Sequence, residues 1–466
     1  MPPSRKGPTG PGPGGTQDVF YARTVLPRPL IVRASGIHMW DDDGREYIDA
    51  SSGPMVSAIG HCNERVVDAI AAQARQLDYA YSLVARNRRN LEFSERLARL
   101  AGPGYERVSL TSGGSEAVDN AVKFARQYAV ATGQESRTRV LALDPSYHGA
   151  TLSTLALGGD PTLDRFLDGF VTRSEKVPAP MSYRIPDGHS AESYAAFCAE
   201  ELERTILALG AETVLAFLVE PVGGLSTGAV VPPPSYFDAI RDICTRHGVF
   251  LIYDEILCGM GRSGEFLTAR NWPDALPDIV VLAKGLGSGY TPLGAMLAPA
   301  GLVDELATIS GFNFSYSANA NPISCAAGLA VLDEFERLDL VTCARERGAQ
   351  LGAGLHELER THPIVGDVRG IGLLWAVELV ADRETKQPLP AAFQPSEKAL
   401  IHGQRNGLML YARSTAGAPH GNWFMVAPPL TITQAETAEL LHRLDRTLAG
   451  LSSDAAAEGL LAGPGG

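Results

Sequence analysis

Short apolar runs alternate with stretches of helical periodicity through the middle of the chain. The runs are nearly continuous, which is typical of strands buried on both faces of a sheet. Strands that alternate with helices predict a parallel sheet covered by helices. The expected strands are Val108–Leu110, Val140–Leu143, Val214–Val219, Val249–Tyr253 and Ile279–Ala283. The expected helices are 115–131, 192–209, 234–247 and 322–337.

The two ends of the chain carry smaller patterns. Apolar residues on either side of an Asp-Asp-Asp-Gly turn predict a hairpin within Ile31–Asp49, and the spacing from Val66 to Leu77 predicts a helix after it. Beyond Leu340, helical stretches alternate with expected strands at Ile371–Val380 and Phe424–Ala427. This part of the chain therefore predicts a second, smaller α/β unit.

Composition and charge argue against several classes of protein. The chain has 466 residues and a formal net charge of −13, which argues against a nucleic-acid-binding protein. No apolar run reaches the roughly 18 residues of a membrane span, so no membrane partner is expected. The six cysteines show neither a CxxC pair nor zinc-type spacing with histidine. We expect no metal site and reduced thiols in a cytoplasmic protein.

A glycine turn between an expected strand and helix is a candidate anion site. Gly113, Gly114 and Ser115 open the helix 115–131. The free N–H groups of a first helical turn, together with the helix dipole, bind phosphate well. The same turn can be an ordinary helix cap, and it matches neither Walker A nor the dinucleotide fingerprint.

Two ionisable residues stand at the ends of expected strands, where ligand sites of parallel sheets lie. Asp254 follows Val249–Tyr253 and could pair with a protonated pyridine nitrogen, but it could also be a surface acid. Lys284 follows Ile279–Ala283. Burial would favour its neutral amine, the form that makes a Schiff base, unless the ammonium reaches solvent.

An aromatic pair completes the set. Tyr147 and His148 follow the strand Val140–Leu143, and an aromatic ring there could stack on a flat cofactor. One domain is thus expected to contain a phosphate-binding turn, an aromatic ring, a carboxylate and a lysine. Together these groups suit a phosphorylated, nitrogen-containing aldehyde. A metal site built on Asp254, Glu255 and His148 is a rival interpretation, although the ligand spacing is absent.

Three segments carry a family resemblance: Leu251–Gly264, Pro277–Gly287 and Pro292–Gly294. They resemble the class III pyridoxal-5′-phosphate (PLP)-dependent aminotransferases, the group that contains omega-amino acid and amine transaminases. The resemblance extends from about Tyr21 to Leu451. It implies PLP fold type I, an α/β fold with a mostly parallel sheet in the large domain and a smaller α/β domain.

The resemblance also implies roles for single residues. Asp254 would pair with the pyridine nitrogen, and Lys284 would be both the Schiff-base residue and the acid–base that moves the proton. The further cofactor-binding residues would be Gly113, Gly114, Ser115, Tyr147, His148, Glu220 and Ser317. Tyr147 and His148 would be the ring-stacking pair, and Glu220 would buttress the cofactor site.

Ser317 stands five residues before Pro322, where the family has a Thr that reaches the phosphate of the neighbouring subunit. Ser315 is the alternative at this position. The resemblance thus implies a homodimer with its sites at the interface.

Departures from the family pattern fall on residues expected to bind substrate. Leu225 replaces a Glu of the ornithine-type members, and Met55 stands where amine transaminases often carry Trp. Arg413 lies close to the position of a carboxylate-binding Arg, and Tyr411 competes for it. Apolar residues near the pocket suggest a donor longer or less polar than alanine.

The Pro/Gly content of 1–17 predicts a disordered leader, and the Ala/Gly content of 452–466 predicts a flexible tail. Between them we expect 18–75 as the N-terminal part of the small domain, 76–325 as the large PLP-binding domain and 326–451 as the C-terminal small domain.

The expected function is a two-step, ping-pong amino transfer from an amine or omega-amino acid to a keto acid, with pyruvate as the expected acceptor. Three alternatives stay open: an aminomutase of the glutamate-1-semialdehyde type, a decarboxylating transaminase, and a PLP-binding protein without turnover.

Overall fold

A computed structural model describes residues 28–159, 166–412 and 421–461 of the chain. Its largest sheet has seven strands in the order β4-β10-β9-β8-β7-β5-β6. They are β4 (Arg107–Thr111), β5 (Arg139–Asp144), β6 (Glu175–Pro178), β7 (Val214–Val219), β8 (Phe250–Asp254), β9 (Ile279–Leu282) and β10 (Gly294–Ala298). Only β10 runs against its neighbours. The other strands share one direction, so their carboxyl ends meet at one edge.

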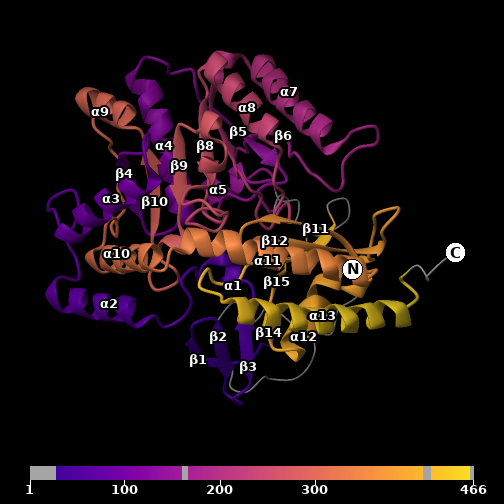
Figure 1. Cartoon of the computed structure of the whole chain (residues 1–466). Helices are drawn as coiled ribbons and strands as arrows, with labels where there is room; N and C mark the ends of the chain where they lie inside the picture. The colour runs from indigo at the N-terminus through magenta and orange to yellow at the C-terminus, as the bar shows by residue number, and fades with distance from the viewer. Residues whose placement is uncertain (1–27, 160–165, 413–420, 462–466) are drawn as a thin grey trace, which may run out of the picture.

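Helices cover both faces of this central sheet (Figure 1). They are α4 (Gly114–Ala131), α5 (Leu152–Leu157), α7 (Ala191–Leu209), α8 (Pro234–His247) and α9 (Ala300–Ile309). The pleat sorts the strand residues between the faces. Leu218 and Ile252 pack with α4 and α9, whereas their chain neighbours Phe217 and Leu251 pack with α7 and α8. All these strand side chains are fully buried, as the apolar runs predicted.

Two smaller sheets lie beside the central one. The first joins β1 (Ile31–Ser35), β2 (His38–Asp41), β3 (Glu46–Asp49) and β14 (Leu408–Met409). The second, called here the C-terminal sheet, joins β11 (Val365–Ile371), β12 (Leu374–Asp382), β16 (Asn422–Val426) and β15 (Tyr411–Ala412), and β13 (Gln387–Pro388) pairs with β12. Because β3 and β14 pair, the first described strands join the C-terminal part of the chain. The expected domain boundaries stay a prediction.

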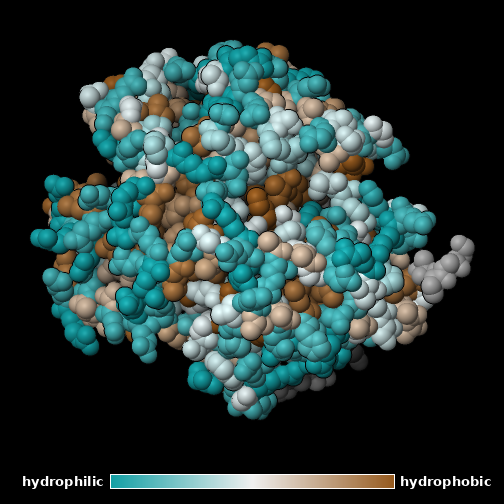
Figure 2. All heavy atoms as spheres, in the orientation of Figure 1, coloured by the Kyte–Doolittle hydropathy of each residue, from teal (hydrophilic) through white to brown (hydrophobic). Residues whose placement is uncertain are grey.

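The remaining helices pack around these sheets. They are α1 (Ser52–Met55), α2 (Glu64–Gln76), α3 (Arg88–Ala101), α10 (Pro322–Arg337), α11 (Leu340–Thr361), α12 (Pro395–Arg405) and α13 (Gln434–Ala457). Hydrophobic residues gather in the recess between the upper and lower halves of the molecule (Figure 2). Along the described residues, no helix is both long and apolar enough to cross a bilayer.

Most expected elements are confirmed, and two expectations are wrong. The segment Ile371–Val380 is not one strand, because the chain turns at Gly372, which has φ +57°, between β11 and β12. The segment expected as a flexible tail from Ser452 starts in a helix, since α13 continues to Ala457 and buries Ala455. Alanine favours helix strongly enough to extend it there. The expected leader 1–17 lies outside the described residues.

Candidate active site

The carboxyl edge of the central sheet gathers the ionisable residues that the sequence predicted. Asp254 is the last residue of β8, Glu220 follows β7 directly, and Lys284 comes two residues after β9. These three strands are neighbours in the sheet. His148 reaches the same place from the loop after β5. The structure therefore brings together four side chains from four separate segments.

Asp254 is held by His148. The Nδ1 atom of His148 lies 2.9 Å from Oδ2 of Asp254, and both side chains are buried. The Ile256 N–H donates to the other carboxylate oxygen at 3.1 Å. With its Nδ1 hydrogen bonded to the carboxylate, the imidazole fixes the direction of Asp254. Within the described part of the chain, the His148 Nε2 atom is buried without a hydrogen-bond partner.

Lys284 occupies a strained turn. Its backbone has φ +41°, a conformation that costs a non-glycine residue free energy. Burial lowers the pKa of the Lys284 amine, against the opposing charges of Asp254 and Glu220. The amine makes no hydrogen bond with any described residue, and the side chain stays partly accessible. The site thus favours a neutral amine that can attack a carbonyl carbon.

Glu220 links two loops. Its carboxylate accepts a hydrogen bond from the Tyr147 N–H at 3.1 Å and another from the Gly224 N–H at 3.0 Å. Burial raises the pKa of Glu220, and the charge of His148 opposes that shift. The side chain fixes the loop of Tyr147 relative to the loop that follows β7.

The glycine turn lies at the N-terminus of α4. Gly113 is the N-cap residue and has no side chain to cap the helix. A Cβ atom added at Gly113 would meet no atom within 4 Å, so the space beside the turn is open. The Ser115 hydroxyl accepts a hydrogen bond from the Ala150 N–H at 3.0 Å, which ties the turn to the loop after His148. An uncapped helix N-terminus with open space beside it suits a phosphate group.

The other predicted site residues lie outside the group formed by the four ionisable side chains. Tyr147 is 36 % exposed. Ser317 is exposed, and its carbonyl accepts a hydrogen bond from the Tyr79 hydroxyl at 2.9 Å. Met55 and Leu225 are buried in one apolar cluster. Arg413 lies outside the described residues.

Sequence analysis missed several contacts of this region. Arg369 and Glu378 form a buried ion pair within the C-terminal sheet, and Arg369 also reaches the loop after Glu220. Charged residues inside otherwise apolar strands were the signal that could have found them, because a buried charge needs a partner. The pairing of His148 with Asp254 left no signal in the sequence.

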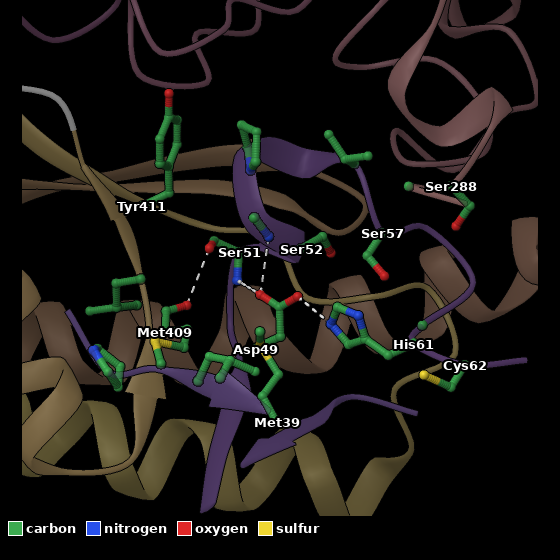
Figure 3. Close-up of a pocket in the computed structure, with 18 of the residues that line it drawn as sticks. Met39, Asp49, Ser51, Ser52, Ser57, His61, Cys62, Ser288, Met409 and Tyr411 are labelled. Carbon is green, nitrogen blue, oxygen red and sulfur yellow. Dashed lines mark hydrogen bonds and ion pairs between the residues drawn. The ribbon is translucent and has the colours of Figure 1, made fainter. Parts of the chain in front are cut away.

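A separate hollow of about 740 Å³ lies near the turn of Lys284 (Figure 3). Ser288 lines it, and so do Asp49 and His61, whose Oδ2 and Nε2 atoms are 2.9 Å apart. Asp49 also accepts a hydrogen bond from the Gly53 N–H at 3.1 Å. Among the described residues, none of the predicted catalytic or cofactor-binding residues lines this hollow.

Comparison with known proteins establishes the family. The model of the class-III aminotransferases matches residues 20–448, so the chain belongs to that family. It is 34 % identical to an uncharacterized aminotransferase of Schizosaccharomyces pombe, over 92 % of this chain and 94 % of the relative.

Solved structures agree with this assignment. The omega transaminase from Pseudomonas jessenii in complex with PMP superposes with a TM-score of 0.87, at 31 % identity over 95 % of this chain and 96 % of that one. A PLP-bound amine transaminase from an uncultivated Pseudomonas species gives 0.85, at 35 % identity over 96 % and 100 %.

The chain is thus an aminotransferase of class III with PLP fold type I, and it uses PLP as its cofactor. The family resemblance inferred from the motifs is confirmed. The residues at the carboxyl edge fit this cofactor, since they supply an amine with no hydrogen bond to any described residue, a held carboxylate and a helix N-terminus without a side-chain cap.

Proposed function

We propose that the protein transfers an amino group from an amine or omega-amino acid to a keto acid, with pyruvate as the acceptor, in two successive half-reactions. The observation that carries this proposal is the Lys284 amine, which makes no hydrogen bond with any described residue, at the same edge as the buried Asp254 carboxylate. Family membership establishes amino transfer, while the donor, the acceptor and the order of steps rest on this proposal.

Each central residue has one task in this scheme. PLP, when bound, supplies an aldehyde carbon and an electron-withdrawing ring. Lys284 would hold the cofactor through its neutral amine and would carry a proton from the donor carbon at Nζ. Asp254, directed by His148, would hold a proton on the ring nitrogen and so favour negative charge in the transition state.

The surrounding residues orient the cofactor. Gly113, Gly114 and Ser115 would bind the phosphate with backbone N–H groups and a hydroxyl. Tyr147 would stack on the ring, and Glu220 would keep the Tyr147 loop in place.

Dimerisation and location complete the proposal. Ser317, or Ser315, would reach the phosphate of a neighbouring subunit, so the active enzyme would be a homodimer. All six cysteines are unpaired, which suits the reducing cytoplasm in which we place the protein.

The donor pocket would lie beside the apolar cluster that contains Met55 and Leu225. Its lining favours a donor longer or less polar than alanine, because an apolar wall gains free energy from burying apolar surface. Arg413 would bind a substrate carboxylate. A strict preference for short dicarboxylic amino acids in a donor screen would contradict this choice.

An absorption experiment tests the function. The PLP-loaded protein is mixed with a panel of amines without acceptor, and pyruvate is then added. We expect one group of amines to bleach the band of lysine-bound cofactor with release of a carbonyl compound, and pyruvate to restore the band.

The alternatives give different results in the same experiment. Release of carbon dioxide would show a decarboxylating transaminase, and turnover of one substrate without an acceptor would show an aminomutase. A cofactor band that responds to no substrate would show a PLP-binding protein without turnover.

A further inference from the structure

The loop Glu220–Val230 connects the carboxyl edge to the C-terminal sheet. All of its residues are buried. At its start Glu220 accepts the Gly224 N–H, and near its end the Gly228 N–H donates to the Gly224 carbonyl at 2.9 Å. One loop therefore carries both the acid that fixes the Tyr147 loop and Leu225, which we expect to line the donor pocket.

The side chains of Ser226 and Thr227 do little to fix the shape of the loop. The hydroxyls of Ser226 and Thr227 are buried without a hydrogen-bond partner in the described part of the chain. The conformation of the loop therefore depends on its backbone groups and on what binds them.

Two side chains of the C-terminal sheet bind three carbonyls of this loop. Trp423, in β16, donates its indole N–H to the Leu225 carbonyl at 2.8 Å. Arg369, in β11, donates from Nε to the Gly228 carbonyl at 2.6 Å and from Nη2 to the Thr227 carbonyl at 3.1 Å. The loop is thus bound from the C-terminal sheet over residues 225–228.

The two side chains are themselves held firmly. The guanidinium of Arg369 lies 5.3 Å from the Trp423 ring centroid and donates to Glu378 at 2.6 Å. Arg184 donates to the other oxygen of Glu378 at 2.7 Å. Buried, charge-assisted hydrogen bonds of this kind restrict the motion of Arg369, so its guanidinium can define the position of what it binds.

The fit around Gly228 shows how closely these groups approach. Gly228 has φ +67°, and a Cβ atom there would lie 2.6 Å from Nη2 of Arg369 and 2.8 Å from Cδ2 of Trp423. At Gly228 the loop backbone rests directly on the two side chains, with no space between them for a Cβ atom.

We propose that Trp423 and Arg369 are positioning residues: they hold the Glu220–Val230 loop from the C-terminal sheet and thereby set the space beside Leu225 that selects the donor by size. This inference rests on the proposed function for its donor pocket. It makes donor selectivity depend on a contact between two parts of the chain that are far apart in sequence.

The test uses Trp423→Phe, which keeps an aromatic ring but removes the indole N–H and leaves the Leu225 carbonyl without its donor. Arg369 is unsuitable as the first variant, since its removal would take one of two arginine partners from Glu378 and the arginine partner from Asp367. Trp375→Phe is the matched control, because the Trp375 indole donates to the Gly372 carbonyl at 2.7 Å, away from the loop.

Two quantities are measured on the full-length, PLP-loaded protein: the kcat/KM ratio between a bulky and a small amine donor, and hydrogen–deuterium exchange of peptides within 220–230. Loss of one buried hydrogen bond predicts a change in the ratio of about five- to tenfold, and exchange in the loop faster by a similar factor. Trp375→Phe should change neither quantity.

Each outcome decides the inference. Faster loop exchange with an altered ratio in Trp423→Phe alone supports it. An unchanged ratio, unchanged loop exchange, or equal effects in both variants overturns it. If the wild-type protein converts no amine, the proposed function fails, the selectivity claim falls with it, and exchange alone decides whether Trp423 holds the loop.

Discussion

The Nδ1 atom of His148 lies 2.9 Å from the Asp254 carboxylate, and the two residues are 106 positions apart in the chain. The contact joins the loop after β5 to the end of β8 across β7. A buried carboxylate held in this way has a fixed direction and a ready proton partner. It is the feature through which the fold would keep a ring nitrogen protonated.

Removing the imidazole should slow the donor half-reaction without preventing cofactor binding. For His148→Phe we expect a loss of about 10- to 100-fold, the cost of one hydrogen bond to a buried charge. His402→Phe is the control, since His402 pairs with Asp454 at 3.0 Å away from the edge. Stopped-flow absorbance with a saturating donor measures the rate, and equal rates in the two variants would exclude a role for His148.

Lys284→Ala should abolish the band of lysine-bound cofactor and reduce turnover by at least about 10²- to 10⁴-fold, since one residue supplies both attachment and proton transfer. Lys398→Ala, at a lysine paired with Glu458 on the surface, should leave both unchanged. Absorbance and a coupled assay for the carbonyl product measure the two effects. Near-normal turnover in Lys284→Ala would refute the assignment.

Cofactor capture should depend on pH in a defined direction. The neutral amine attacks the aldehyde, so the capture rate by the PLP-free protein rises with pH through the pKa of Lys284. Burial lowers that pKa, so the rate should level off below the value of about 10.4 that is usual for lysine.

The charge of Asp254 raises the pKa of Lys284 against the effect of burial, so removing that charge should lower the pKa further. In Asp254→Asn the plateau should therefore begin at lower pH, whereas Asp304→Asn, which breaks a surface pair with Arg107, should match the wild type. Rapid-mixing absorbance across pH gives both profiles. A plateau at or above the usual lysine range would contradict the desolvated amine.

Gly149→Ala should weaken PLP binding. Gly149 has φ +138°, and a Cβ atom there would lie 2.6 Å from the Ser115 hydroxyl and 2.5 Å from Oγ1 of Thr154. The backbone strain alone costs about 1–3 kcal/mol, which corresponds to at least a severalfold rise in Kd if binding requires the same loop conformation. Gly301→Ala, whose Cβ would meet nothing within 4 Å, is the control. Titration with PLP measures the effect, and equal Kd values would show that this loop does not shape the phosphate site.

The apolar runs predicted strands of the central sheet because strands that are buried on both faces need apolar residues at every position. Every residue of β7 is buried, as its continuous apolar run indicated. The predicted helix 234–247 matches α8, in which Pro234 opens the helix and Gly248, with φ +62°, ends it. The pattern did not reveal β10, because Gly294–Ala298 contains no β-branched or aromatic side chain of the kind that favours strands.

The candidate site was predictable as far as it depends on strand ends. Asp254 and Lys284 could be placed at one edge because parallel strands end together. The contacts that hold them could not be predicted in the same way. The pairing of His148 with Asp254, and that of Trp423 with Leu225, depends on how separate loops pack, which no local pattern encodes.

Borohydride trapping followed by peptide mass spectrometry shows whether Lys284 carries the cofactor and releases it to a donor amine. PLP-loaded protein is reduced before and after exposure to a donor amine without acceptor. We predict that reduction before the donor amine is added fixes the cofactor to Lys284. If the amine is added before reduction, Lys284 should stay unmodified while a carbonyl product appears. Cofactor fixed to another lysine, or a label on Lys284 that no amine removes, would contradict this prediction.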